Sequence, residues 1–129
     1  MKREIKFRAW DKEQNNMWGW DKLIDKQGTY LNSKYFAVMQ YIGLHDKNRK
    51  EIYEGDIVKY NFDMQSKFVV KWCKRKAGFE YLEIKKKKRF LSNKQKTKRS
   101  EYGISQHPGS YEVEIIGNIY QDKKLLQNK

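Results

Sequence analysis

Apolar and polar residues alternate along several short stretches of this chain, and the alternation predicts β-strands. In "EIKFRAW", residues 4–10, Ile5, Phe7 and Ala9 share one side of an extended backbone and charged residues occupy the other. Further predicted strands are "MWGWDKLI" (17–24), "YFAVMQYIG" (35–43), "DIVKYNF" (56–62), "KFVVKWC" (67–73), "GFEYLEI" (78–84) and "YEVEIIGNIY" (111–120). Short strands at spacings of about ten residues predict a small barrel or sandwich.

Turn-forming residues separate the predicted strands. Residues 46–49 form one predicted turn, and residues 54–56 form another directly before "DIVKYNF". We expect Gly43 to end a strand where a side chain would block the turn, and Gly55 to adopt a positive φ. The Asp56 carboxylate is expected to accept hydrogen bonds from nearby backbone amides and so to fix its turn.

Composition supports a folded, strand-rich chain. Of the 129 residues, 38% are hydrophobic and 15% are aromatic, and disordered chains lack such aromatic content. Aromatic and β-branched residues favour strands over helices. The length suits one domain or two very small ones. We predict a mainly β fold, α+β overall, with an N-terminal strand-rich unit at 1–50 and a C-terminal barrel at 51–129.

The sequence carries no recognised catalytic motif, so we predict a protein that is not an enzyme and that needs no cofactor or small-molecule substrate. Glu51, Glu54 and Asp56 are close enough in sequence to suggest a magnesium site, but turn chemistry already accounts for two of them. His45 and His107 lie in loop-like stretches without a second ligand at metal-binding spacing. No metal site is therefore predicted.

Cysteine content and hydropathy bear on the compartment. Cys73 is the single cysteine, so no intrachain disulfide can form, which fits a reducing cytoplasm. No apolar run approaches the roughly 18 residues that span a bilayer. The N-terminal "MKREIKFRAWDKE" has no apolar core of a signal peptide. We expect a cytoplasmic protein without membrane contact.

Positive charge is concentrated in one segment. The 29 Lys and Arg residues and 16 Asp and Glu residues give a formal net charge of +13, and "KKKKRFLSNKQKTKR" (85–99) contributes +9 of it. A local excess favours a polyanionic partner, and lysines bind phosphate without reading bases. We predict sequence-independent contacts with nucleic acid. The candidate residues are Lys74, Arg75, Lys76, Lys85, Lys86, Lys87, Lys88, Arg89, Lys94, Lys96, Lys98 and Arg99.

A solvated loop is the alternative interpretation of the basic segment. Like charges repel, and a long connection at 85–110 between strands can remain without a partner. If residues 68–73 and 78–84 pair as a hairpin, residues 74–76 lie at its turn and Lys85 leaves from the opposite end. The two basic clusters would then lie apart unless the long loop folds back. In the first of these strands, Phe68, Val70 and Trp72 are expected to share one face.

Three blocks of the sequence, in this order, resemble the YopX family of prophage-encoded proteins. They are "IKFRAWDKE", "MQYIGLHDKNRKEIYEGDIV" and "IIGNIYQDKKLL", which together frame nearly the whole chain. The resemblance implies a phage or prophage origin, a C-terminal SH3-like β-barrel, a smaller α+β N-terminal part and self-association into a homo-oligomer. It implies no known activity and carries over no catalytic residue.

One position departs from the family pattern. Members of the family often carry Asn-Gly after "DK", whereas this chain has Asn48-Arg49. Because Arg tolerates a positive φ poorly, we expect either a different turn type or Asn48 in the left-handed conformation.

Together these features predict a non-enzymatic prophage protein of the bacterial cytoplasm that binds nucleic acid through phosphate contacts from a basic loop. The alternative is a protein-interaction or assembly module of a phage with no nucleic-acid role. A metal-dependent nuclease using Glu51, Glu54 or Asp56 is the least favoured hypothesis.

Overall fold

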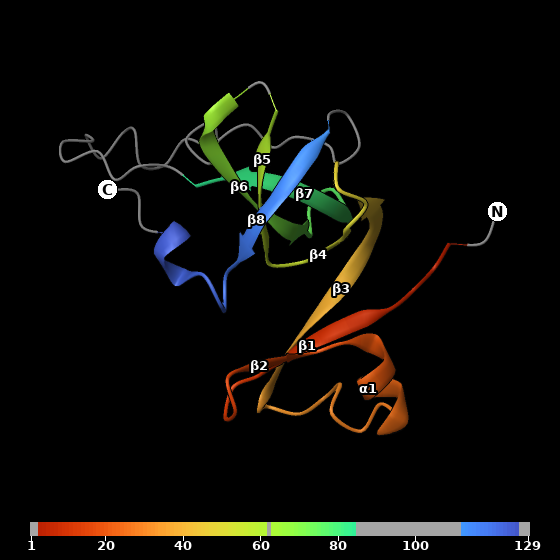
Figure 1. Cartoon of the computed structure of the whole chain (residues 1–129). Helices are drawn as coiled ribbons and strands as arrows, with labels where there is room; N and C mark the ends of the chain where they lie inside the picture. Colours follow the sequence, from red (N-terminus) through yellow and green to blue (C-terminus); the bar gives the residue numbers. More distant parts are fainter. Residues whose placement is uncertain (1–2, 62, 85–111, 127–129) are drawn as a thin grey trace.

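The computed structural model describes residues 3–61, 63–84 and 112–126, without the side chains of residues 63 and 64. The strands are β1 (Phe7–Asp11), β2 (Asn16–Trp18), β3 (Phe36–His45), β4 (Glu51–Tyr53), β5 (Asp56–Tyr60), β6 (Asp63–Cys73), β7 (Gly78–Glu83) and β8 (Val113–Asn118). They form two antiparallel four-stranded sheets, ordered β2-β1-β3-β4 and β7-β6-β5-β8 (Figure 1). The prediction of a mainly β fold is confirmed.

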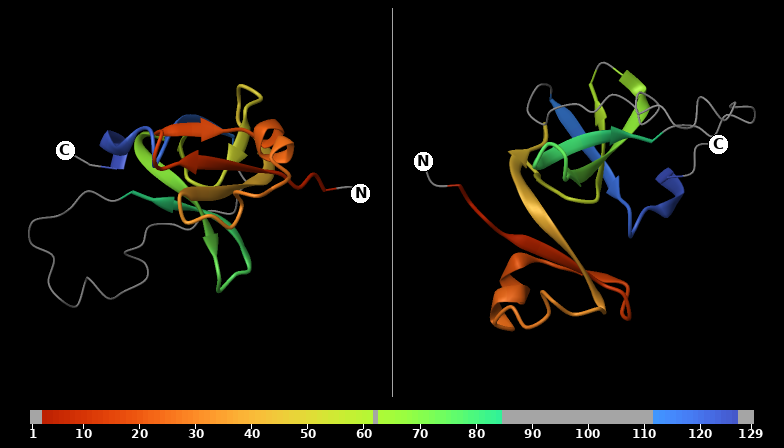
Figure 2. Two further views of the ribbon diagram at one scale, coloured as in Figure 1. Left: turned by 90° about the horizontal axis from the view of Figure 1, so that it is seen from below. Right: turned by 180° about the vertical axis from the view of Figure 1, so that it is seen from behind.

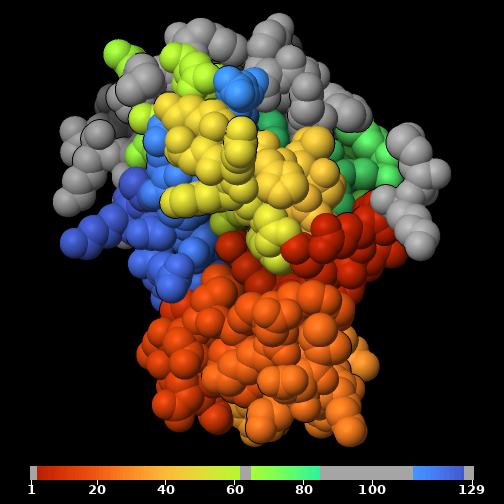
Figure 3. Space-filling view, turned by 45° about the vertical axis from the view of Figure 1, so that its right-hand side comes forward, coloured from red at the N-terminus to blue at the C-terminus, as the bar shows by residue number. Residues whose placement is uncertain are grey.

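The stretch predicted as a single strand at residues 17–24 is part strand and part helix. Strand β2 ends at Trp18, and helix α1 (Trp20–Asp25) begins after Gly19. Leu23 is fully buried whereas its neighbour Ile24 is 51% exposed. This short helix therefore buries one side and leaves the other exposed. Strands β1 and β2, helix α1 and the start of β3 form a lobe, called here the N-terminal lobe (Figure 3).

Strand β3 belongs to both parts of the molecule. Its residues from Phe36 to Gln40 pair with β1, and its later residues Tyr41 and His45 lie opposite β4. The strand therefore runs from the N-terminal lobe into the C-terminal body (Figures 1 and 2). The register shifts between Tyr41 and His45, and Gly43 lies in this bulge with φ of +91°.

The expected reason for Gly43 is wrong. This glycine lies inside β3, not at a strand end, and a Cβ added there would meet no heavy atom within 4 Å. Glycine is needed for the left-handed backbone of the bulge, and not for lack of space. The expectation for Gly55 is confirmed, since its φ is +84°.

The hydrophobic core lies within the C-terminal body. Its buried cluster draws one or two residues from each of six strands: Ile42, Ile52, Val58, Tyr60, Phe68, Val70, Tyr81 and Val113. Ile42 comes from the unit predicted at residues 1–50, because β3 extends into the body. The division of the chain into 1–50 and 51–129 stays a prediction.

In the turn between β3 and β4, Arg49 has the positive φ that we expected it to avoid. Arg49, not Asn48, adopts the left-handed conformation, with φ of +64°. Asp46 imposes this shape: its Oδ1 accepts hydrogen bonds from the backbone N–H groups of Asn48 (2.8 Å) and Lys50 (2.9 Å). The backbone N–H of Asp46 also donates to the carbonyl of Lys50 at 2.8 Å. These bonds offset the strain of about 1–2 kcal/mol for a non-glycine residue there.

The C-terminal segment crosses back over β8. A Cβ added to Gly117 would lie 2.6 Å from Oδ2 of Asp122 and 2.8 Å from Cδ1 of Leu125, so a larger residue here would require these side chains to move. Leu125 belongs to a short 3-10 helix, Lys123–Leu126. The Asn118 side chain accepts hydrogen bonds from the backbone N–H groups of Tyr120 (3.0 Å) and Gln121 (2.8 Å) and so holds the turn that starts the crossing.

Candidate nucleic-acid interface

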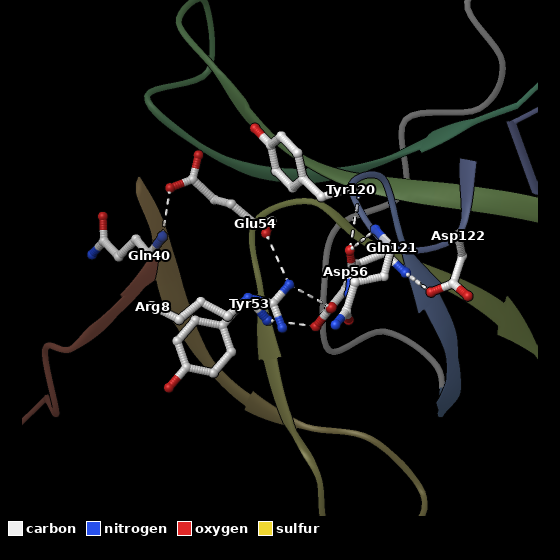
Figure 4. Close-up of polar contacts among 9 residues, drawn as sticks. Arg8, Gln40, Tyr53, Glu54, Asp56, Tyr120, Gln121 and Asp122 are labelled. Atoms are coloured by element: carbon white, nitrogen blue, oxygen red, sulfur yellow. Dashed lines mark hydrogen bonds and ion pairs between the residues drawn. The ribbon is translucent and has the colours of Figure 1, made fainter. Parts of the chain in front are cut away.

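A polar cluster joins the N-terminal lobe to the body (Figure 4). Arg8 of β1 donates to Oδ1 of Asp56 at 2.7 Å, and Oδ2 of Asp56 accepts from the backbone N–H of Tyr53 at 2.8 Å. The second bond confirms that Asp56 fixes its turn. The Arg8 guanidinium also lies 4.8 Å from the centre of the Tyr53 ring. Burial raises the pKa of Asp56, and the Arg8 charge offsets this only in part.

Further contacts reinforce this junction. Glu54 Oε1 accepts a hydrogen bond from the backbone N–H of Gln40 in β3 at 2.8 Å. Trp10 of β1 stacks on Tyr120, with ring centroids 5.9 Å apart. Burial raises the pKa of Tyr53 to about 12, so its hydroxyl stays neutral at physiological pH. We interpret the junction as a structural connection, because its charged groups are engaged with one another.

The three carboxylates considered for a metal site point to different partners. Glu51 forms an ion pair with Lys6, Glu54 accepts from the backbone of Gln40, and Asp56 pairs with Arg8. Across the described ranges 3–61, 63–84 and 112–126, no group of three His, Cys, Asp or Glu residues is placed to hold a metal ion. The arrangement therefore offers no support for a metal-dependent nuclease at these residues. His107 lies outside the described residues.

The predicted basic site is described only in part. Lys74, Arg75 and Lys76 are exposed in the turn between β6 and β7. The nine candidates between Lys85 and Arg99 lie outside the described residues. Lys76 forms an ion pair with Glu80 at 3.7 Å. Within the described part of the chain, the side chains of Lys74 and Arg75 make no ion pair.

The predicted hairpin is confirmed, with Phe68 opposite Glu83 and Cys73 opposite Gly78. Its turn lies at one end of the sheet. At the other end, the backbone N–H of Ile84 donates to Lys67, and Val113 of β8 pairs with Tyr60. The segment that carries the +9 charge therefore enters and leaves the sheet at the end away from the turn at 74–77.

A basic turn that the sequence reading missed lies near that entry and exit point. The backbone N–H of Lys47 donates to the carbonyl of Val113 at 2.9 Å, and Oδ2 of Asp46 accepts from Ile115 at 3.1 Å. This attaches the β3–β4 turn to the outer edge of β8. Lys47 pairs with Glu114 at 3.4 Å. The signal was present as three basic residues in "DKNRK", but only pairing between distant segments brings this turn to β8.

Trp72 is the second feature that sequence reasoning missed. It lies on the same face of β6 as the buried Phe68 and Val70, as predicted, yet it is 48% exposed. Its ring packs edge-to-face on Phe79 of β7, with centroids 5.1 Å apart and an interplanar angle of 77°. After Cys73, the exposed residues Lys74, Arg75 and Lys76 form the turn. An exposed indole beside several cations is suited to contact with a nucleic acid.

These observations define a small, mainly β protein with an exposed basic hairpin tip. A family model for the YopX protein matches residues 6–127, and the chain belongs to this family. The structure is similar to the crystal structure of protein EF1440 from Enterococcus faecalis, with a TM-score of 0.57 and 21% sequence identity, covering 98% of this chain and 100% of that one. At this identity the likeness concerns the fold alone. No curated protein matches the chain. None of the helices in the described ranges is long and apolar enough to cross a membrane.

Proposed function

We propose that this chain is a non-enzymatic prophage protein that binds nucleic acid in the host cytoplasm, mainly through phosphate contacts from basic residues. The observation that carries the proposal is the exposed turn between β6 and β7, where Lys74 and Arg75 make no ion pair with the described residues. Charges that are not neutralised within the fold remain available to release counterions from a phosphate backbone. The +9 segment at 85–99 adds to the same polyanion affinity.

The proposed architecture of the C-terminal part is an SH3-like barrel. The curling of the β7-β6-β5-β8 sheet and the shared core with β3 and β4 support it. Attachment of the β3–β4 turn to the outer edge of β8 is a further supporting feature, since it covers an otherwise open sheet edge. Self-association into a homo-oligomer would multiply weak basic contacts on one assembly.

The proposal predicts binding that weakens steeply with salt. The affinity for random-sequence duplex and single strands is measured by fluorescence anisotropy at several salt concentrations. The log–log slope is expected to be about −0.9 per neutralised phosphate on duplex DNA. Replacing Lys74 and Arg75 with Ser is expected to make this slope shallower, and replacing residues 85–88 with Ser to do so further.

A matched control separates local contact from loss of net charge. Replacing Lys26 and Lys34 with Ser removes the same two charges from exposed positions on the N-terminal lobe. This control is expected to leave the slope nearly unchanged. Absence of binding by the unmodified chain even at low salt would refute the proposed function.

A protein-interaction or assembly module is the second candidate function. Its supporting observation is that Ile5, Ile24 and Tyr35, all within the first 35 residues, are 59%, 51% and 47% exposed. Exposed apolar side chains favour association with another protein surface. Sedimentation of the chain after nuclease treatment and at high salt tests this. An assembly that persists there, and that dissociates in an Ile24→Ser variant, favours this candidate; a monomer under all conditions counts against it.

A further inference from the structure

The tip of the β6–β7 hairpin extends beyond the sheet that carries it. Strand β5 pairs with β6 as far as the pair Ile57 and Val69. Beyond that point β6 continues to pair with β7 through Lys71–Glu80, Trp72–Phe79 and Cys73–Gly78. These last residue pairs form a two-stranded extension. It places the side chain of Trp72 beyond the region in which Phe68 and Val70, on the same face of β6, are buried.

Phe79 holds the indole of Trp72 in a defined position. Phe79 is itself partly buried and packs against the hydrophobic core. The edge-to-face contact between the two rings therefore anchors an exposed aromatic group to a rigid base. A Trp side chain has only two rotatable bonds, so contact with a ligand costs little conformational entropy here.

The charge around Trp72 selects the kind of ligand. Lys74 and Arg75 follow Trp72 in the turn after Cys73, and both are exposed. A purely apolar protein partner would have to desolvate these cations, whereas a polyanion would neutralise them. A nucleic acid supplies both phosphates for the cations and flat rings for the indole. In a duplex the faces of the bases are already stacked, so only an unpaired base can offer a free face.

We propose that Trp72, supported by Phe79, is a stacking platform for an unpaired base and gives this protein a preference for single-stranded over duplex nucleic acid. The inference rests on the nucleic-acid binding proposed above and adds its substrate class. Lys74 and Arg75 hold the phosphates beside the stacked base.

The experiment compares three probes with the full chain: a thymidine homo-oligomer, an abasic strand of equal length and charge, and a duplex of equal length. Trp72→Ala is expected to weaken binding of the homo-oligomer about tenfold or more. Its binding of the abasic strand and of the duplex is expected to stay within about twofold of the unmodified chain, since phosphate contacts remain. Trp72→Phe is expected to retain most of the affinity, because a phenyl ring still stacks.

Two controls make the result specific. Tyr35→Ala removes an aromatic ring of nearly equal exposure, 47%, from the N-terminal lobe, and is expected to change nothing. Quenching of tryptophan fluorescence by the homo-oligomer is expected in the unmodified chain and lost in Trp72→Phe, although binding persists there. Circular dichroism and thermal unfolding verify that each variant is folded.

The possible outcomes separate this inference from the proposed function. Equal loss of affinity for the homo-oligomer and the abasic strand in Trp72→Ala overturns the stacking platform, because the effect would not depend on bases. Unchanged binding of all three probes by Trp72→Ala also overturns it, while the general nucleic-acid function stands. Absence of binding of every probe by the unmodified chain overturns both.

Discussion

The junction around Arg8 and the tip of the β6–β7 hairpin both carry positive charge, but they differ in what surrounds it. At the junction, the Arg8 guanidinium pairs with the buried Asp56 and lies against the Tyr53 ring. At the tip, Lys74 and Arg75 face solvent without an ion pair among the described residues. The role of a cation therefore depends on its partners: the Arg8 charge is held within the fold, and the charges of Lys74 and Arg75 remain available for a ligand.

Breaking the junction is expected to have the largest effect on stability. Arg8→Met leaves the Asp56 carboxylate buried without its cation, which is expected to lower the free energy of unfolding by about 3–5 kcal/mol. Urea denaturation measures this loss. Arg3→Met, at an exposed position, is the control and is expected to change little.

The loss in Arg8→Met should depend on pH. The pKa of Asp56 is raised in the folded chain, so protonation of this carboxyl stabilises the folded state relative to the unfolded state. Removing the neighbouring cation raises that pKa further. The loss of stability is therefore expected to shrink as the pH falls and Asp56 becomes neutral. A loss below about 1 kcal/mol at neutral pH would show that the junction contributes no more than an ordinary surface ion pair.

A substitution at Asp46 is expected to reduce stability less than Arg8→Met and more than a substitution at the hairpin tip. Burial alone would raise the pKa of Asp46, but hydrogen bonds from the backbone of Ile115, Lys50 and Asn48 outweigh it and lower the pKa. Asp46→Asn places an amide N–H₂ group where the carboxylate accepted a hydrogen bond. A loss of about 1–3 kcal/mol is expected because a buried donor is left unsatisfied.

The sign of the pH effect at Asp46 is opposite to that at Asp56. The pKa of Asp46 is lower in the folded chain than in the unfolded chain. Its carboxylate therefore stabilises the folded state at pH values above the unfolded-state pKa of about 4, and this contribution disappears as the pH falls through the folded-state pKa. Thermal unfolding across this range is expected to show a smaller acid-induced loss in Asp46→Asn than in the unmodified chain. Asp25→Asn, at an exposed position, serves as the control. An identical pH dependence in Asp46→Asn would contradict the assignment.

The smallest expected effect on stability is at the hairpin tip. Replacing Lys74 and Arg75 with Ser is expected to change the free energy of unfolding by less than about 0.5 kcal/mol, as for other exposed positions. The same variant is expected to bind nucleic acid with a reduced salt slope. Urea denaturation measured beside the binding assay tests both properties. A large loss of stability would remove the contrast between the two regions.

Several features of the fold followed from the sequence with little ambiguity. Strands β1, β3, β5 and β7 lie where residue type and alternation predicted strands, and the hairpin of β6 and β7 was predicted with its turn. Asp56 fixes its turn, and Gly55 has the expected positive φ. These are local properties, because the period of side-chain orientation and the demands of a turn involve only near neighbours in the chain.

Two predictions from the sequence differ from the structure. Arg49 adopts a conformation that its own preference disfavours, because Asp46 and the edge of β8 hold the turn. Helix α1 lies where a strand was predicted, and Leu23 is its buried residue. At Arg49, the hydrogen bonds of Asp46 to Asn48 and Lys50 and its bond to Ile115 of β8 outweighed the preference of the residue itself.

From the sequence alone it follows that this chain is rich in strands separated by turns and is strongly basic in one segment. Its three blocks also pointed to the YopX family, which the family model confirms. Tertiary structure alone decided which cations would be neutralised and which aromatic ring would remain exposed. Trp72 lies on the strand face that carries core residues, but β5 pairs with β6 only as far as Val69 in the direction of the β6–β7 turn. The side to which a residue points is a local property, whereas its burial depends on which other segments reach it.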